Sequence, residues 1–293
     1  MKHSTARTTL ASGNEQQMLG SLGTDAVPEA ITLSGIVVAA HPDDEVIGVG
    51  ARLGRWRALR VVHVTDGAPE DMRDARALGI GTRGEYAALR RAERRRAYDL
   101  AAIPEQLTHD IGVVDQEATF ALVRLTTELH AIFRATVPSV VVTHPYEGGH
   151  PDHDATAFAV HAAVQLLADD GATVPAIVEM TSYHRGPHGG ISTGTFLPSD
   201  HRAAFHTPLS ALTRRLKQEM LACHASQARV LTHFGCDAEP IRIAPHYDFT
   251  VAPHGGLLFY EQLGWPITGA EWRARAREAT RTLGLGRSGA LFS

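Results

Sequence analysis

Cysteine is scarce in this sequence, with two copies, Cys223 and Cys236, among 293 residues. Two isolated thiols exclude a disulfide framework and a cysteine-rich metal site. No stretch approaches the ~20 consecutive apolar residues that cross a bilayer. Residues 1–30 also lack the apolar core of a secretory signal. These absences predict a cytoplasmic protein without a membrane span.

An excess of positive charge is also missing. The formal net charge is −4, with 28 Lys and Arg against 32 Asp and Glu, which argues against nucleic acid as a partner. The basic run "RRAERRR", residues 90–96, is short and interrupted by Ala and Glu. We expect this run to be a solvated face of a helix.

Histidine, by contrast, is abundant, with 17 copies. Histidine is a frequent metal ligand and general acid or base, so this count favours a protein that performs chemistry. The hydrophobic fraction of 44% is typical of a globular protein with a sizeable core. The length suits one large α/β domain or two small ones.

Short apolar runs alternate with helical patterns along the chain. The runs that predict strands are 36–40, 60–65, 140–143 and 176–184, and the helical patterns cover 45–59, 85–103, 118–136 and 154–169. Continuous apolar strands that alternate with helices are typical of a parallel sheet covered on both faces. We therefore predict a single α/β domain, Rossmann-like, with a mostly parallel sheet flanked by helices.

Three regions fall outside this alternation. Residues 1–30 are rich in Ser, Thr, Gly and Gln, which predicts a poorly ordered or loosely docked arm and leaves 31–293 as the folded domain. The Gly- and charge-rich residues 69–84 predict a mobile loop. The Gly- and Pro-rich residues 185–208 predict a long loop within the domain.

The stretch "IVVAAHPDDEVIGVG", residues 36–50, leads from the first predicted strand into His41, Asp43, Asp44 and Glu45. Adjacent carboxylates repel one another, and the exit of a buried strand is a costly place to gather them. They become tolerable if a divalent cation lies among them. Ligands of parallel sheets bind beyond the carboxyl ends of the strands, which is where this cluster falls.

A second polar cluster, "THPYEGGHPDHDA" at residues 143–155, follows the third predicted strand and contains His150 and His153. Two imidazoles and one carboxylate, drawn from the two clusters, suit a catalytic zinc ion with a position left for water. The same set suits ferrous iron. The residues alone do not decide whether Asp43 or Asp44 binds the ion.

The motif "AHPDDE", with "HPDH" about a hundred residues later, resembles the LmbE-like (PIG-L) family of zinc-dependent N-deacetylases. The resemblance implies a zinc site made by His41, Asp44 and His153. It also implies that Asp43 is the general base and that His150 stabilises the tetrahedral intermediate.

Weaker motifs extend the resemblance from about Ile36 to Gln227. They are "VVHVTDGA", similar to the family's second strand; "RRAERRRA", similar to its Arg-x-x-Glu helix, with Arg90 and Glu93; and "KQEMLACHASQ", similar to its Lys…His-x-Ser-Gln helix, with Lys217, His224 and Gln227. We expect Arg90, Asp66 and Tyr146 to contact the substrate.

The resemblance implies a metal-dependent hydrolase that removes an N-acetyl group from an amino sugar or glycoconjugate. Its cofactor would be Zn²⁺, or Fe²⁺ in its place, and its partner a small-molecule N-acetylated sugar. Two alternatives stay open: an LmbE-like amidase that cleaves a larger amide conjugate, and a non-catalytic sugar-binding protein of the same fold. The oligomeric state is also open, and a homo-oligomer is among the alternatives.

A nucleotide-binding Rossmann protein is a rival from another class. Gly48, Gly50 and Gly54 form a glycine-rich stretch, but the dinucleotide fingerprint requires its glycines in the turn directly after the strand. Here that turn is "AHPDDE", whose carboxylates would repel a pyrophosphate, and Leu53 stands where the third glycine belongs. The sequence therefore disfavours a nucleotide cofactor.

Overall fold

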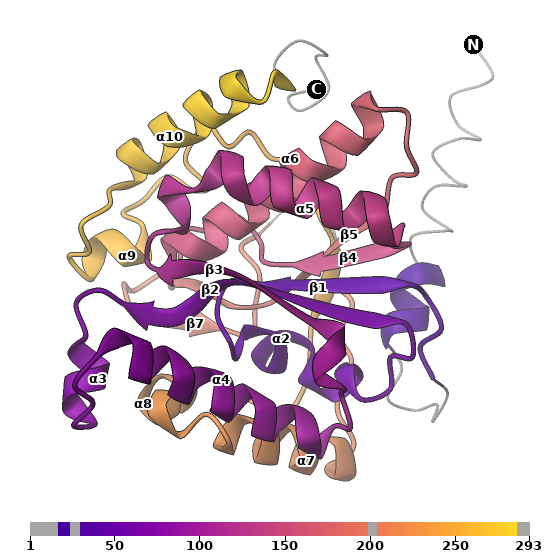
Figure 1. The fold of residues 1–293 in the computed structure, drawn as a ribbon, viewed down its shortest axis with the longest axis vertical. Helices are drawn as coiled ribbons and strands as arrows, with labels where there is room; N and C mark the ends of the chain where they lie inside the picture. The colour runs from indigo at the N-terminus through magenta and orange to yellow at the C-terminus, as the bar shows by residue number, and fades with distance from the viewer. Residues whose placement is uncertain (1–16, 24–29, 199–203, 286–293) are drawn as a thin grey trace.

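A six-stranded sheet runs through the centre of the molecule (Figure 1). The structure is a computed structural model that describes residues 17–23, 30–198 and 204–285. The strands lie in the order β3-β2-β1-β4-β5-β8. They are β1 (Gly35–Ala39), β2 (Leu59–Pro69), β3 (Thr108–Asp115), β4 (Val140–Thr143), β5 (Ala176–Met180) and β8 (Ile241–Ile243). Strand β8 is antiparallel to β5 and the other pairs are parallel, so the predicted fold class is confirmed.

Helices cover both faces of this sheet (Figure 1). One face carries α5 (Leu122–Thr136), α6 (Pro151–Asp169) and α10 (Gly269–Thr282), and the other carries α2 (Asp44–Leu53), α4 (Arg83–Leu100) and α7 (Ala211–Ala222). Successive side chains of a strand point to opposite faces. Accordingly, Ile36 and Val38 pack with the first set of helices, whereas Val37 and Ala39 pack with the second. Both faces of β1 are buried, which explains its uninterrupted apolar sequence.

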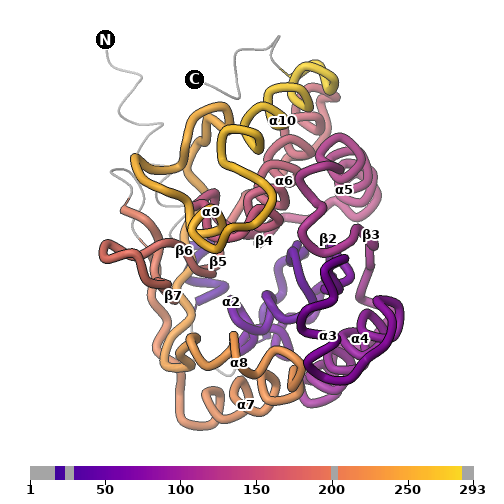
Figure 2. Tube along the Cα trace, turned by 90° about the vertical axis from the view of Figure 1, so that its left-hand side faces the viewer, coloured from indigo at the N-terminus to yellow at the C-terminus, as the bar shows by residue number. Residues whose placement is uncertain are grey.

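The order of the strands reverses beside β1, because β2 lies on one side of it and β4 on the other. Open α/β sheets bind ligands outside the carboxyl ends of their strands at such a reversal. Figure 2 views the molecule from this end, with short elements around the strand ends. These are α3 (Arg73–Ala77), α8 (Ala228–Leu231), α9 (Phe259–Gln262) and the hairpin of β6 (Tyr183–Arg185) and β7 (Ile191–Thr193).

Strand β3 was not among the predicted strands. It is an edge strand paired with β2, and only two of its residues, Ile111 and Val113, are buried. A half-solvated edge strand has no continuous apolar run, so its sequence gives little signal. The predicted strand 176–184 is in fact two, β5 and β6, which belong to different sheets. The predicted loop 69–84 contains helix α3.

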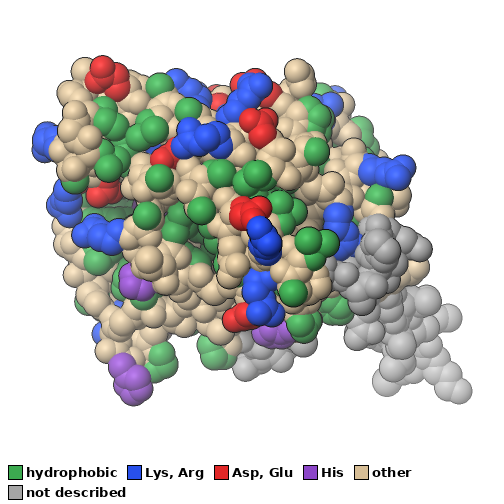
Figure 3. Space-filling view, turned by 90° about the horizontal axis from the view of Figure 1, so that it is seen from below, with side chains coloured by type: hydrophobic (Ala, Val, Ile, Leu, Met, Phe, Trp, Pro, Cys, Tyr) green, Lys and Arg blue, Asp and Glu red, His purple; other side chains and the backbone are tan. Residues whose placement is uncertain are grey.

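The run 90–96 is not a fully solvated face as expected, because Arg90, Glu93 and Arg94 are buried. Each has a partner inside the protein: for example, Arg94 binds the carboxylate of Asp110 through both terminal nitrogens. On the face shown in Figure 3, below α4 and α7, basic and acidic side chains are interspersed.

The expected N-terminal arm, residues 1–30, lies largely outside the described residues. Residues 17–23 are helical, and Leu19 and Leu22 are buried in the core on the α2 side of the sheet. Arg52 of α2 donates from Nε to the carbonyl oxygen of Leu22 at 2.8 Å, which ties this segment to the domain. Of the helices that the structure describes, none has the length and apolar character needed to cross a bilayer.

Candidate active site

Two loops carry the candidate residues to the carboxyl edge of the sheet. His41 follows β1, and α2 begins at Asp44. His150 follows β4 and is the N-cap of α6, where its Nδ1 accepts a hydrogen bond from the backbone N–H of Asp152 at 3.1 Å. The turn before His150 requires glycine: Gly149 is so close to the chain at Tyr183 that a Cβ would lie 1.9 Å from that residue's carbonyl oxygen.

Three buried side chains converge as a candidate metal site. His41 Nδ1 lies 3.0 Å from Asp44 Oδ2, and His153 Nε2 lies 3.2 Å from Asp44 Oδ1. One ligand atom from each of the three falls within 4.8 Å of the others. Burial opposes a charge on Asp44, but the imidazoles of His153 and His144 hold its pKa well below the usual value. The donor set of two imidazoles and one ionised carboxylate fits Zn²⁺ or Fe²⁺.

The second ring nitrogen of each ligand imidazole lies close to a polar side chain. Ser182 Oγ lies 3.0 Å from His153 Nδ1. His41 Nε2 lies 3.1 Å from Asp115 Oδ1 and 3.4 Å from Asp152 Oδ2. Metal-binding histidines commonly give their second ring nitrogen to such a partner, which fixes the tautomer and the orientation of the ring. Burial opposes the charged form of His41, but the carboxylates of Asp115 and Asp44 raise its pKa well above the usual value.

Among the described residues, a second group of potential ligands shares His41 and adds Asp115, His150 and Asp152. Both carboxylate oxygens of Asp152 already accept hydrogen bonds. Oδ2 accepts the backbone N–H of Gln116 at 2.6 Å, and Oδ1 accepts the backbone N–H of Ala118 at 3.1 Å. We therefore interpret Asp115 and Asp152 as carboxylates that orient His41 through close N···O contacts and, through the backbone of Asp152, orient His150.

His144 lies beside the metal group but differs from the ligands in its hydrogen bonding. Its ring stacks on His153 with a centroid distance of 4.1 Å, and its Nε2 accepts the backbone N–H of Ala40 at 3.0 Å. Burial and the neighbouring His153 lower the pKa of His144 to about 4. The neutral ring therefore supports His153 by packing, and its Nε2 lone pair is already used.

Asp43 belongs to neither group of potential ligands among the described residues. It lines the cavity, and its Oδ2 accepts a hydrogen bond from Arg90 Nη2 at 3.0 Å. Burial raises the pKa of Asp43, and the Arg90 guanidinium opposes that rise. A buried carboxylate next to a metal site, with a pKa raised in this way, is suited to accept a proton.

His150 is placed to donate a hydrogen bond. Burial and the nearby His41 hold the pKa of His150 well below the usual value, so its imidazole is neutral. Because Nδ1 accepts from the backbone of Asp152, the ring proton is on Nε2. A neutral imidazole with Nε2–H as donor can stabilise negative charge that develops on a substrate oxygen.

These groups open into a cavity of about 490 Å³, a volume typical of small-molecule sites. Arg90 lies in its wall, as do Trp265 and Phe259 from the C-terminal part of the chain. The other two predicted substrate contacts are engaged elsewhere. Asp66 pairs with Arg83 and accepts the backbone N–H of Ala68.

Tyr146 is 3% exposed and packs against Tyr247, Phe249 and Trp272. Its hydroxyl donates to the carbonyl oxygen of Val251 at 2.9 Å. The structure thus brings His41, Asp43, Asp44, Arg90, His150 and His153 together around one cavity, and it places Asp66 and Tyr146 in other contacts.

Two of the weaker motifs contact each other beside the cavity, whose wall includes Tyr86 and Gln227. Glu93 accepts the backbone N–H and the hydroxyl of Ser226, at 2.8 and 2.6 Å. Gln227 donates to the hydroxyl of Tyr86 at 2.7 Å. These contacts join α4 to the turn after α7 and so fix the helix that carries Arg90.

Asp115 is a site residue that the sequence did not suggest. It ends the unpredicted strand β3 and lies in the cavity wall. Its place in the sequence could have indicated it, because Asp115 directly follows the apolar pair Val113 and Val114 at the end of a strand.

The chain is similar to known proteins in part of its sequence and in its fold. The family described as "PIG-L: GlcNAc-PI de-N-acetylase" matches residues 36–164. No curated protein sequence matches the chain. Among solved structures, the A40926 pseudoaglycone deacetylase Dbv21 is similar with a TM-score of 0.54 and 19% identity, over 74% of this chain and 98% of that one.

Two further solved structures share the fold. The conserved protein TT1542 from Thermus thermophilus has a TM-score of 0.51 and 22% identity, over 73% of this chain and 95% of that one. The N,N'-diacetylchitobiose deacetylase from Pyrococcus horikoshii has a TM-score of 0.50 and 20% identity, over 75% of this chain and 87% of that one.

Proposed function

We propose that the chain, whose residues 36–164 match the PIG-L family model, is a metal-dependent hydrolase of the PIG-L (LmbE-like) kind that removes an N-acetyl group from an amino sugar or glycoconjugate. One observation carries this proposal. Ligand atoms of His41, Asp44 and His153 meet within 4.8 Å, while the neighbouring Asp43 stays outside the group and faces the same cavity. The proposed cofactor is Zn²⁺, with Fe²⁺ as the alternative.

Each residue has a role in the proposed hydrolysis of the amide. His41, Asp44 and His153 would hold a divalent ion, which would act as a Lewis acid and lower the pKa of a bound water. Asp43 accepts the proton of the attacking water. His150 donates its Nε2–H to the carbonyl oxygen as negative charge develops there. Asp43 then returns that proton to the departing amine, and Arg90 holds the Asp43 carboxylate in place throughout.

The names of the relatives support the choice of reaction. The family description names a de-N-acetylase, and two similar solved structures are named as deacetylases, one of them for N,N'-diacetylchitobiose. The proposed partner is accordingly a small-molecule N-acetylated sugar.

A screen for the release of amine tests the proposal. The purified, zinc-loaded protein is incubated with N-acetylated sugars and with larger N-acyl conjugates, with and without a chelator. We expect release from at least one substrate, abolished by the chelator and restored when metal is added back. Binding of a sugar without release would instead support a non-catalytic binding protein, and release that persists in the chelator would contradict the metal site.

A further inference from the structure

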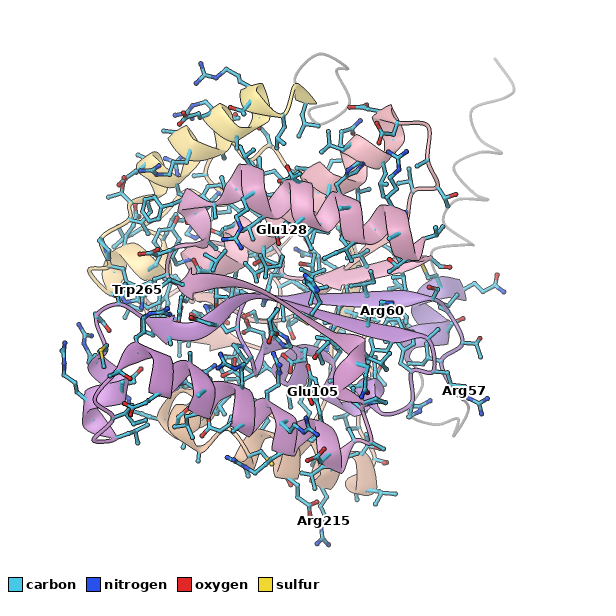
Figure 4. All side chains as sticks on the ribbon, in the orientation of Figure 1. Arg57, Arg60, Glu105, Glu128, Arg215 and Trp265 are labelled. Carbon is cyan, nitrogen blue, oxygen red and sulfur yellow. The ribbon has the colours of Figure 1, made fainter. Side chains whose placement is uncertain are left out.

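The segment from Leu258 to Trp265 contributes to the active site although it lies more than a hundred residues after His150. It contains α9 and the turn that follows it. Trp265 is partly buried and lines the cavity together with His150 and the metal group. Figure 4 labels Trp265 on the same side of the molecule as α9, at the end of the sheet opposite Arg60 of β2. This position is the carboxyl end of the strands.

Backbone contacts clamp this segment onto the turn that carries His150. The backbone N–H of Phe259 donates to the carbonyl oxygen of Gly148 at 2.8 Å. Leu258, which is buried, covers Gly148: a Cβ there would lie 2.6 Å from Leu258 Cδ2. Gly148 also has a φ of +69°, which favours glycine. Glycine at position 148 therefore allows the turn and the C-terminal segment to pack this closely.

The indole of Trp265 then meets the imidazole of His150. The ring centroids are 4.5 Å apart and the planes are inclined at 68°, an edge-to-face arrangement of the kind that aromatic pairs prefer. His41 approaches the same imidazole with a centroid distance of 4.5 Å, and the backbone of Asp152 occupies Nδ1. The Nε2 of this imidazole has no hydrogen-bond partner among the described residues, whereas Trp265, His41 and the backbone of Asp152 contact the rest of the ring.

We propose that Trp265 is a positioning residue that holds the His150 imidazole in the orientation required to donate from Nε2 to the reacting oxygen. The inference rests on the proposed function for its kinetic test and on geometry alone for its structural test. It assigns part of the active site to the C-terminal segment, which the sequence motifs did not include. Small displacements of a catalytic group lower rates steeply, so this contact should be visible in turnover.

A double-mutant cycle between Trp265 and His150 tests the proposal. We expect His150→Ala to lower kcat by about a hundredfold and Trp265→Ala to lower it by about tenfold, with a smaller change in KM. In the His150→Ala background, Trp265→Ala should change kcat by less than about twofold, because interacting residues are not additive. Trp265→Phe, which keeps an aromatic ring, should recover most of the lost turnover. Equal losses in both backgrounds would overturn the proposal.

A second measurement does not depend on activity. Imidazole NMR signals of the zinc-loaded protein, with His150 assigned from the His150→Gln variant, should shift for His150 in Trp265→Ala. The matched control is Leu257→Ala, in the same part of the chain but 50% exposed, which should leave the His150 signal and turnover unchanged. An unshifted His150 signal in Trp265→Ala would overturn the proposal even if no substrate is hydrolysed, whereas absent hydrolysis with a shifted signal would count only against the proposed function.

Discussion

Arg90 donates from Nη2 to Oδ2 of Asp43 at 3.0 Å, and both side chains are buried. The two residues are 47 positions apart in the sequence and belong to α4 and to the loop after β1. A buried carboxylate that is not a metal ligand requires a partner of this kind to remain ionised. The pair therefore links the Arg-x-x-Glu motif of α4 to the proposed general base.

Replacement of Arg90 should move the pH dependence of hydrolysis. The guanidinium opposes the rise in the pKa of Asp43 that burial causes, so Arg90→Gln should raise that pKa further. Because Asp43 must be ionised to accept a proton, the acidic limb of the kcat/KM profile should move to higher pH by about one unit or more. The control is Arg91→Gln, which changes the next, exposed residue of α4. An unmoved acidic limb in Arg90→Gln would contradict the proposed pairing.

Asp43→Asn should separate metal binding from turnover. The amide keeps the shape of the carboxylate but accepts no proton, so kcat should fall by about 10²–10⁴-fold. Metal content, measured by elemental analysis, should stay at the wild-type level because Asp43 lies outside the ligand group. A metal-loaded Asp43→Asn protein with the wild-type rate would rule out the role of base. Loss of the metal would instead make Asp43 a ligand.

Asp115→Asn should weaken the metal site without removing a ligand. Asp115 Oδ1 lies 3.1 Å from His41 Nε2, and loss of such a partner typically lowers metal affinity by about 10–100-fold. The affinity can be measured by competition with a chromophoric chelator. As a control, Asp237→Asn changes an aspartate whose side chain is 83% exposed. Equal affinities for the wild type and Asp115→Asn would show that His41 does not depend on this contact.

Glu147 should make the free energy of unfolding depend on pH. Arg242 Nε lies 2.6 Å from Glu179 Oε2, whereas Arg242 Nη2 lies 3.4 Å from Glu147 Oε1. One guanidinium is therefore shared by two buried carboxylates. Burial raises the pKa of Glu147 to about 8, although Arg242 opposes the rise. The folded protein therefore retains a proton that the unfolded chain releases near pH 4.5. The stability from this group is complete below that pH and is lost as the pH rises to about 8.

Urea unfolding at about pH 5 and about pH 8 checks this expectation. The wild type should lose on the order of 3 kcal/mol from this group over that interval, and Glu147→Gln should lose correspondingly less. Glu128→Gln, at a partly exposed residue of α5 (Figure 4), is the control for a general effect of charge. If Glu147→Gln and the wild type lost the same free energy, Glu147 would be ionised in both states.

The sequence predicted the parts of this protein that depend on local pattern. Buried strands such as β1 and β4 are continuous apolar runs, so the sheet and the polar loops at its edge could be expected. Strand β3 could not, because only Ile111 and Val113 of its residues are buried. Missing that strand also meant missing Asp115 at its end.

Side-chain contacts that depend on tertiary packing could not be predicted from the sequence pattern. Asp66 was expected at a strand exit, but β2 continues to Pro69, and the Asp66 carboxylate pairs with Arg83. Tyr146 likewise packs into the core rather than into the cavity wall. Trp265 reaches His150 from a distant part of the chain, a contact that no spacing in the sequence indicates.

Anomalous diffraction at the zinc edge, from crystals of the zinc-loaded protein, tests the central claim most directly. The account predicts one ion bound by His41, Asp44 and His153, with the Asp43 carboxylate outside its coordination and still bound to Arg90. An ion coordinated by Asp43, or one held by Asp115, His150 and Asp152 with Asp44 and His153 unliganded, would contradict it.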